Sequence, residues 1–385
     1  MNTQNDNFFL RGVLVFVCLI AMVVALFLPC ASVEATLYQQ DNLVSDIPGL
    51  AAFTDPNLVN PWGIASTPTS PFWISDNGTG LSTLYRGTGE PVPLVVTILP
   101  SPGGSPTGVV FNTGAVNGAF GGDVFLFVSE DGTISGWRGA LGTFAEVLQT
   151  ADSANVYKGT TVATVGGHVY LYSANFRAGT IDVLKGDASA PSLTGNFTDP
   201  TLPSGYAPFN IQNINGNLYV TYALQDAAKA DDVSGAGNGI VDVFDANGNF
   251  IKRLISNGLL SPLNSPWGMA IAPTGFGEYS NDLLIGNFGD GRINAFDPVT
   301  GAQVGTLEDV TGNPLVIPGL WGLRFGNGGI GFDSSSLYFT AGIPGDGFKE
   351  DHGLFGRISV PEPSTFLLLG AGLAGVGLIR RKLRR

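Results

Sequence analysis

The sequence predicts an all-β protein with the architecture of a six-bladed β-propeller, and three observations support this. Short runs of β-branched and aromatic residues alternate with Gly-rich turns, and the body of the chain keeps no sustained 3.6-residue apolar period. A unit of one turn and two strands returns six times, at intervals of about 45 to 58 residues. That interval accommodates four strands and their loops, and a closed ring leaves no free sheet edge.

The repeated unit is clearest at two places in the chain. Residues 60–65 are Asn-Pro-Trp-Gly-Ile-Ala, and residues 265–270 are Ser-Pro-Trp-Gly-Met-Ala. A second strand and a Gly turn follow each, over residues 72–78 and 283–289. We expect strand 35–45 to supply the outermost strand of the last blade and so close the ring. The alternative is a pair of β-sandwiches with a coincidental period. Weaker copies of the unit begin at Ser105, Lys158, Ala207 and Gly319.

The N-terminal segment has the features of a secretory leader. Arg11 precedes an apolar run over residues 12–29, and Val-Glu-Ala at residues 33–35 offers a small-residue cleavage site. This pattern predicts a signal peptide, with a signal helix, over residues 1–35. An uncleaved membrane helix is the alternative. A lipoprotein signal at Cys30 is disfavoured by the proline before it.

The C-terminal segment, residues 360–385, combines a short motif, an apolar run and a basic tail. After Pro361, Glu362 and Pro363, residues 364–379 hold no charge, which predicts a transmembrane helix with a cytoplasmic C-terminus. The segment resembles the PEP-CTERM sorting signal of exported bacterial proteins, in which an exosortase recognises Pro-Glu-Pro. The resemblance implies export by the secretion machinery, transient anchoring in the inner membrane, and delivery to the cell envelope or the exterior. A permanent tail anchor of another type is the alternative.

The body between these segments is expected to form the propeller, over residues 36–359. It resembles a family of exported bacterial proteins with an NHL-like or lactonase-like propeller and no established activity. The resemblance covers residues 38–358, and it implies a fold and no catalytic roles. The pieces that match are residues 60–65, 76–78, 265–268 and 285–291.

Composition excludes some classes of function. The chain has 31 Asp and Glu against 18 Lys and Arg, a net charge of −13, and six of the basic residues lie in the two targeting segments. An acidic surface repels nucleic acid, so we expect no nucleic-acid partner. Both cysteines, Cys18 and Cys30, fall within the leader. We therefore expect no disulfide, catalytic thiol or thiolate metal site in the mature chain.

One face of the predicted propeller is rich in side-chain oxygens. The turns into the innermost strands and the turns from each second to each third strand meet there. Asn and Asp are common in turns because they bond their own backbone, so a structural role is one interpretation. The other is that several of these oxygens converge on Ca²⁺, which takes about six to eight oxygen ligands. The residues expected on this face are Asp76, Asn77, Glu130, Asp131, Asn175, Asn287, Asp290 and His352.

Trp62, Trp267 and Trp321 recur at one position of the unit. They would either stack on sugar rings or pack between neighbouring blades, and packing is the commoner role. His352 follows two carboxylates and would serve as a general base, although no nucleophile or metal cluster accompanies it. His168 lies in a Gly-Gly-His turn and is expected at the surface. Motifs of the G-x-S-x-G, phosphate-loop and H-E-x-x-H types are absent from the sequence.

These features favour a non-catalytic binding or scaffold module outside the cell, acting on exopolysaccharide or another envelope component. The polysaccharide-linked sorting signal and the oxygen-rich face support this expectation. The alternative is a Ca²⁺-dependent hydrolase of lactonase type that uses the propeller channel. Ice binding is a third interpretation, disfavoured because no flat array of threonines is visible.

Overall fold

Among the described residues, the regular secondary structure is almost wholly β-strand, as the sequence predicts. The computed structural model describes residues 36–100, 104–329, 332–346 and 350–361. The chain divides after Thr36, and the propeller belongs to the unit that begins at Leu37. The signal helix predicted within residues 1–35 and the transmembrane helix predicted over residues 364–379 lie outside the described ranges, in which no helix is long and apolar enough to cross a membrane. The helices found are 3-10 turns: η1 (Ala115–Asn117), η2 (Ala119–Gly122), η3 (Gly139–Leu141) and η4 (Gly277–Tyr279).

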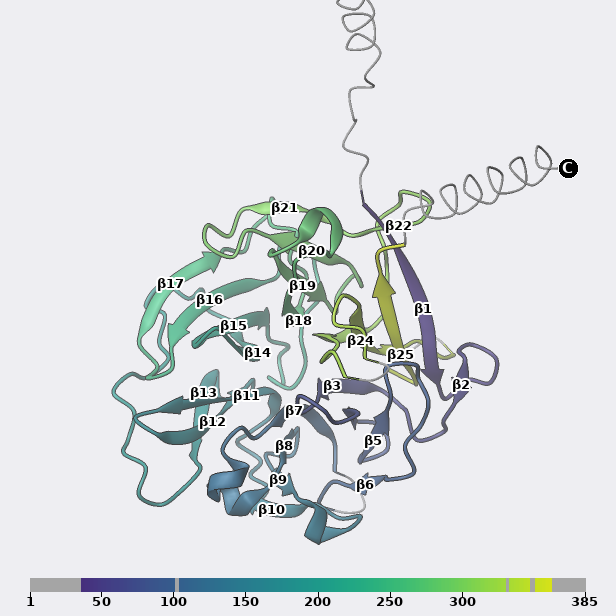
Figure 1. Cartoon of the computed structure of the whole chain (residues 1–385). Helices are drawn as coiled ribbons and strands as arrows, with labels where there is room; N and C mark the ends of the chain where they lie inside the picture. Colours follow the sequence, from purple (N-terminus) through teal and green to yellow (C-terminus); the bar gives the residue numbers. More distant parts are fainter. Residues whose placement is uncertain (1–35, 101–103, 330–331, 347–349, 362–385) are drawn as a thin grey trace, which may run out of the picture. The chain divides into compact units, whose positions relative to one another are not determined.

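Six sheets surround a common centre, which confirms the six-bladed propeller (Figure 1). Blade 1 contains β3 (Pro61–Ala65), β4 (Phe72–Asp76), β5 (Leu81–Tyr85) and β6 (Val96–Thr97). Blade 2 contains β7 (Pro106–Phe111), β8 (Phe125–Ser129), β9 (Ile134–Trp137) and β10 (Glu146–Gln149). Blade 3 contains β11 (Tyr157–Val165), β12 (His168–Asn175) and β13 (Thr180–Lys185). Blade 4 contains β14 (Tyr206–Ile214), β15 (Asn217–Leu224), β16 (Ile240–Asp245) and β17 (Phe250–Ile255).

Blades 5 and 6 complete the ring. Blade 5 contains β18 (Pro266–Ile271), β19 (Leu283–Asn287), β20 (Ile293–Phe296) and β21 (Gln303–Thr306). Blade 6 contains β23 (Leu320–Phe325), β24 (Leu337–Ile343), β25 (His352–Ser359) and the N-terminal strand β1 (Leu37–Ser45). Two short strands, β2 (Phe53–Thr54) and β22 (Glu308–Asp309), pair in parallel with β1.

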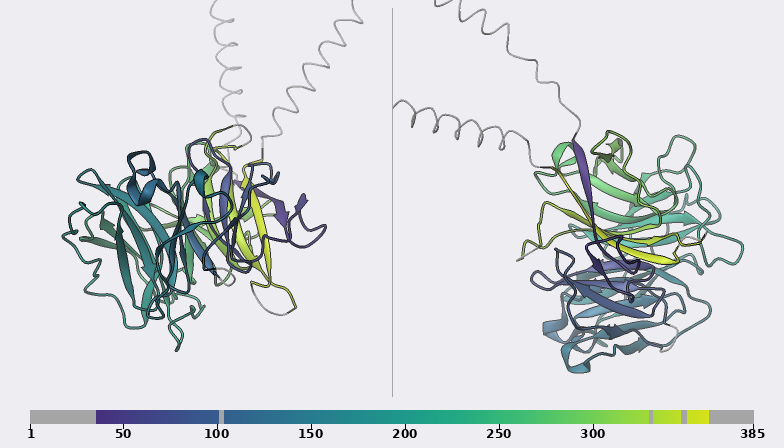
Figure 2. Two further views of the ribbon diagram at one scale, coloured as in Figure 1. Left: turned by 90° about the horizontal axis from the view of Figure 1, so that it is seen from below. Right: turned by 90° about the vertical axis from the view of Figure 1, so that its right-hand side faces the viewer.

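The ring is closed by the N-terminal strand, as the sequence predicts. Strand β1 pairs antiparallel with β25, from Gln39 opposite Ser359 to Ser45 opposite Leu354. Figures 1 and 2 show this purple strand beside the yellow strands of the last blade. The outermost strand of blade 6 therefore comes from the opposite end of the propeller sequence, about 300 residues away.

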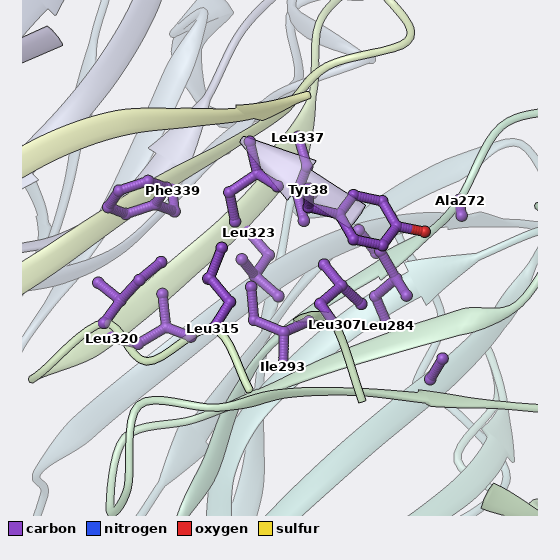
Figure 3. Close-up of a cluster of buried hydrophobic side chains, with 14 of the residues drawn as sticks. Tyr38, Ala272, Leu284, Ile293, Leu307, Leu315, Leu320, Leu323, Leu337 and Phe339 are labelled. Atoms are coloured by element: carbon purple, nitrogen blue, oxygen red, sulfur yellow. The ribbon is translucent and has the colours of Figure 1, made fainter. Parts of the chain in front are cut away.

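Tyr38 anchors the closing strand in the core between blades 5 and 6. Its ring is fully buried, 5.0 Å from the ring of Phe276 by centroids, and its hydroxyl donates to the Phe276 carbonyl at 3.1 Å. Figure 3 shows this ring among leucines of both blades, including Leu284, Leu323 and Leu337. Closure therefore depends on packing as well as on strand pairing.

Each clear copy of the repeat begins its inner strand with the same local geometry. Asn60 and Ser265 have positive φ values of 46° and 47°, and each precedes a proline, which is tolerated as the first residue of a strand. Strand pairing then shifts register, between Pro61 and Ile64 in β3 and between Pro266 and Gly268 in β18. Such bulges redirect side chains. Here they accompany a tryptophan that points into the centre of the propeller.

The glycine after that tryptophan lets neighbouring inner strands approach closely. A Cβ on Gly268 would lie 2.5 Å from the Trp321 carbonyl oxygen of the next blade, and one on Gly63 would lie 2.6 Å from the Thr107 carbonyl oxygen. The other glycines at this position also lie close to the next inner strand: a Cβ would lie 2.7 Å from the Trp62 carbonyl oxygen at Gly322, 2.7 Å from the Thr160 nitrogen at Gly108, and against the Asn210 side chain at Gly159. In blade 4 the position is Asn210, whose Nδ2 donates to the Trp267 carbonyl oxygen at 2.7 Å. We call these six residues the glycine ring.

Blade 3 departs from the four strands that the repeat predicts. Residues 186–205 follow β13, and the structure assigns no strand within them. This segment contains three prolines, which cannot donate to a sheet ladder. The N–H groups of Gly195 and Phe197 donate instead to the carbonyls of Asn247 and Gly248 in blade 4. The segment therefore fills the space between blades 3 and 4.

Candidate functional site

The central channel has two different ends. We call the face at which the inner strands begin the start face, and the face at which they end the end face. Because consecutive strands of a blade are antiparallel, the turns from second to third strands also lie on the start face. The polar residues predicted from the sequence belong to that face. The inner strands are β3, β7, β11, β14, β18 and β23.

Aromatic side chains fill the channel near the start face. Trp62, Trp267 and Trp321 are each exposed by 4% or less. The rings of Trp62 and Trp321 stack with centroids 3.5 Å apart, and Trp267 meets them edge-on at 6.1 and 5.8 Å. The three come from blades 5, 6 and 1, which are neighbours in the ring, so the expected packing role is confirmed. Phe176, Phe209 and Phe288 join the same cluster.

Lys158 occupies the corresponding tryptophan position in blade 3 and brings a charge into the channel. Its side chain is only 1% exposed, and its Nζ lies 2.5 Å from Glu130 Oε1 and 3.1 Å from Asp231 Oδ1. The Nζ also lies 5.0 Å from the centre of the Trp62 ring, within cation–π range. Asp231 belongs to the segment between β15 and β16, so that loop contributes to the channel mouth.

Amide groups extend this network around the start face. Asn77 Nδ2 donates to Glu130 Oε2 at 3.0 Å. Asn60 Nδ2 donates to Asn77 Oδ1 at 3.2 Å and to Glu350 Oε1 at 3.0 Å. Trp321 Nε1 donates to Asn60 Oδ1 at 3.2 Å. The network thus couples the polar mouth of the channel to the aromatic cluster beneath it.

Burial and charge set the protonation of the network. Burial raises the pKa of Glu350 to about 7, the Asn60 hydrogen bond opposes this shift, and the charge of Glu130 adds to it. Burial alone would lower the pKa of Lys158, but the carboxylates of Glu130 and Asp231 outweigh it and raise this pKa. At neutral pH an ammonium therefore sits between two carboxylates. Within the described ranges, no three His, Cys, Asp or Glu side chains are grouped so as to hold a metal ion.

The residues predicted from the sequence divide into two sets. Asn77 and Glu130 belong to the network. Asp76 lies next to Asn77 but is fully buried, accepts the Thr83 N–H at 2.9 Å, and has a pKa that burial raises well above its usual range. Asp76 is therefore directed into blade 1 and away from the channel.

Four other predicted residues bond to their own turns or to nearby loops. Asp131 Oδ1 accepts the Thr133 N–H at 2.9 Å, and Asp290 Oδ1 accepts the Arg292 N–H at 3.2 Å. Asn175 Nδ2 donates to Asp182 Oδ2 at 2.8 Å. Asn287 Nδ2 donates to the Pro262 carbonyl at 2.8 Å and to Asp290 Oδ1 at 3.1 Å. These contacts are those of structural turns.

The two histidines pair with single carboxylates. His352 Nδ1 lies 2.6 Å from Asp46 Oδ2, a residue that follows β1, and not against its sequence neighbours Glu350 and Asp351. His168 Nδ1 lies 2.9 Å from Asp187 Oδ2 on the outer part of blade 3. Neither contact belongs to the Lys158 network.

Toward the end face, the channel contains a cavity of about 480 Å³. This volume lies within the range of small-molecule sites, roughly 300 to 1,000 Å³. Trp267 contributes to its wall, together with hydroxyl and amide side chains that include Ser66, Thr113 and Asn213. Arg324 is the single charged residue among those that line it. Five residues that lie two positions after a member of the glycine ring line the cavity: Ala65, Val110, Thr161, Gln212 and Arg324.

The sequence interpretation missed the most informative channel residues. Lys158 and Arg324 lie within two copies of the repeat, at positions where the clearest copies have Trp and Ala. A comparison of the six copies, position by position, would have found them. Asp231 and Glu350 have no such signal, because they lie in irregular segments outside the repeat.

The fold and the C-terminal motif define a class of protein: an exported six-bladed β-propeller with an exosortase sorting signal. Residues 359–385 match the model of the PEP-CTERM protein-sorting motif. This match confirms the resemblance seen at Pro361 and the two residues after it. It implies export to the envelope and processing by an exosortase.

Relatives of known sequence place the chain in a family. It is 34% identical over 324 residues to "Uncharacterized protein R648" of Acanthamoeba polyphaga mimivirus, with 80% of this chain and 78% of that protein covered. It is 33% identical over 317 residues to "Uncharacterized protein L690" of the same virus, with 78% of this chain and 80% of that protein covered. The chain belongs to the family of these two proteins.

Solved structures with a similar arrangement are distant in sequence. The structure of streptogramin B lyase is 13% identical, covers 84% of this chain and 97% of its own, and has a TM-score of 0.44. A glucose dehydrogenase is 13% identical, covers 83% of this chain and 98% of its own, and has a TM-score of 0.48. Similarity at this level carries no information about activity.

Proposed function

We propose that this protein is a binding module of the cell envelope or extracellular matrix, and that it holds a saccharide of that compartment, such as part of an exopolysaccharide, in the end-face cavity. The observation that carries the proposal is the cavity itself, which combines hydroxyl and amide side chains with the half-buried apolar side chains of Val110 and Phe111. Such a combination suits a sugar, which has both hydroxyl groups and apolar C–H faces.

At the start face, opposite the cavity, the channel is packed in a way that indicates a structural role. There the aromatic cluster is packed, and Lys158 makes ion pairs with both Glu130 and Asp231. A ligand would therefore reach the channel from the end face. The rigid, closed ring would hold the cavity in one shape and limit the entropy lost on binding.

The targeting segments supply the location. We propose a leader over residues 1–35, a propeller over residues 36–359 and a sorting signal over residues 360–385. The sorting signal would anchor the protein in the inner membrane until an exosortase cleaves near the Pro-Glu-Pro motif. The processed propeller would then remain in the envelope or be released.

Occlusion of the cavity provides the test. Val110 lines the cavity, and Val110→Phe would fill part of it; Val116 is 92% exposed outside it, so Val116→Phe is the matched control. We expect a glycan array followed by calorimetry to find a saccharide that binds the parent protein and the control but not Val110→Phe. Equal binding by all three proteins would place the ligand elsewhere and refute the proposed site.

A calcium-dependent hydrolase of lactonase type is the second candidate. The acidic side chains of Glu130, Asp231 and Glu350 at the start face are the observation that favours it, and the ammonium of Lys158 between the first two is the observation against it. Calcium titration with an ester and lactone panel separates the two functions. Calcium-dependent turnover that is lost in Asn77→Ala and in Asn287→Ala would overturn the binding-module proposal.

A further inference from the structure

Arg324 is the arginine that lines the end-face cavity, and no carboxylate among the described residues compensates its charge. Arg177 and Arg292 also lack an ion pair in the described part of the chain, but they do not line the cavity. Its Nε donates to Ser66 Oγ at 3.2 Å, and its Nη2 donates to the Ser66 carbonyl at 3.2 Å. Both acceptors are neutral. Among the described residues, no Asp or Glu lies within ion-pair distance of this guanidinium.

Four other arginines of the propeller have a guanidinium that is paired with a carboxylate, as is usual for a stabilising contact. Each makes an ion pair with a carboxylate: Arg86 with Glu90, Arg138 with Asp123 and Glu146, Arg253 with Asp199 and Asp242, and Arg357 with Asp41. Burial lowers the pKa of Arg324, which reflects the cost of holding this charge away from water without a counter-ion. Ion pairing within the propeller therefore does not account for the charge at Arg324.

The contacts with Ser66 also orient the side chain. They use one edge of the planar guanidinium, Nε and Nη2, and leave Nη1 without a protein acceptor among the described residues. Arg324 lines the end-face cavity together with Gln212, which occupies the equivalent position of blade 4 and whose amide makes no hydrogen bond within the described structure. Two partly buried polar side chains, each with hydrogen-bonding groups that no described protein atom engages, thus line one cavity.

We infer that the end-face cavity takes an anionic ligand and that Arg324 holds its carboxylate or phosphate group. The inference rests on the cavity of the proposed function and narrows its ligand to an acidic saccharide, either a uronate or a sugar phosphate. A planar guanidinium recognises both anions through paired, charge-assisted hydrogen bonds. The net charge of the chain, −13, repels anions at long range, so local recognition has to come from Arg324.

Calorimetric titration of the processed protein with glucuronate, glucose 1-phosphate, inorganic phosphate and glucose tests this inference. We expect an anionic probe to bind more tightly than glucose. Arg324→Gln should weaken that binding about 10- to 100-fold, the loss expected for hydrogen bonds to a charged group. Arg324→Lys keeps the charge but loses the paired geometry, and should fall between. Arg86→Gln removes an exposed arginine outside the channel and should bind as the parent does.

The outcomes distinguish the inference from the proposal on which it rests. Anion binding that is equal in the parent and Arg324→Gln, or absent from the parent, overturns the inference. Binding of neutral saccharides that Arg324→Gln does not change leaves the saccharide proposal standing without it. Phosphate binding that requires Arg324, with no binding of any saccharide, supports the anion site and overturns the saccharide proposal. Urea unfolding of each variant shows whether a loss of binding reflects a loss of folded protein.

Discussion

The glycine ring predicts that one added methyl group at the centre of the propeller destabilises the whole domain. In Gly268→Ala the new Cβ would lie 2.5 Å from the Trp321 carbonyl oxygen, 2.8 Å from Leu323 Cγ and 3.2 Å from the Leu323 N. Two of these atoms are backbone atoms of the next inner strand, so no rotamer change relieves the contact. Relief requires β18 and β23 to move apart.

The size of that movement sets the expected effect. Ordinary contact begins at 3.4 Å, so the two strands must separate by about 0.9 Å where Gly268 meets Trp321. A closed ring resists this, because opening one seam strains the other five. Overpacking of this kind costs about 1–3 kcal/mol. We expect urea unfolding of Gly268→Ala to give a lower midpoint with an unchanged m-value.

Gly139→Ala is the matched control. A Cβ on Gly139 meets nothing within 4 Å, and Gly139 does not have a positive φ. This variant should be neutral or more stable by about 0.4–1 kcal/mol, since alanine restricts the unfolded chain. If Gly268→Ala were as stable as Gly139→Ala, the close approach of the inner strands would not hold the ring together, and the reasoning would be wrong.

Three further predictions concern closure, pH and processing. Tyr38→Ala should lower the free energy of unfolding by about 3–5 kcal/mol, because it removes the buried ring. Tyr38→Phe removes only the hydroxyl and should lower it by about 1 kcal/mol. Equal stability of Tyr38→Ala and the parent in urea would refute closure by β1. Burial raises the folded-state pKa of Glu350 from 4.5 to about 7, so the contribution of its protonated form to stability is present below pH 4.5 and is lost as pH rises to 7. The free energy of unfolding in urea should therefore depend less on pH over this range in Glu350→Gln than in the parent. An equal pH dependence in the two proteins would contradict that pKa. Intact mass of the mature protein from cells with an active exosortase should lack Arg385, and its retention would argue against cleavage.

The fold was largely predictable because its strongest determinants are local. The Pro-Trp-Gly turns at residues 61–63 and 266–268 predict two inner strands, and weaker copies at intervals of about 45 to 58 residues predict the others. A predicted strand before the first unit belonged to no copy of the repeat, which implied that it closes the ring, and β1 does so by pairing with β25. Blade 3 was expected from the copy that begins at Lys158, but its lack of a fourth strand was not predicted. Whether residues 186–205 form a strand depends on hydrogen bonds to blade 4 that have no local signature.

The site was only partly predictable because its contacts join distant segments. Asn77 and Glu130 were expected on the start face, and they do meet there. The rest of the network could not be deduced from spacing, because it joins distant segments: Lys158 and Asp231, which contact each other, lie 73 residues apart in the chain. His352 shows the same difficulty: the sequence placed it beside adjacent carboxylates, whereas its partner is 306 residues away.

The residues that break the repeat therefore deserve more functional weight than the residues that form it. A position shared by the copies, such as the glycine ring, meets the same demand in each blade, and closure of the ring accounts for it. A departure has no such explanation from symmetry. Lys158 departs at the tryptophan position, and its charge is matched by Glu130 and Asp231, so local electrostatics explain it. Arg324 brings a charge to the position two residues after the ring, where the other blades have uncharged residues, and no carboxylate among the described residues matches it. By this reasoning the channel bears its specific chemistry at the end face, where the unmatched charge lies.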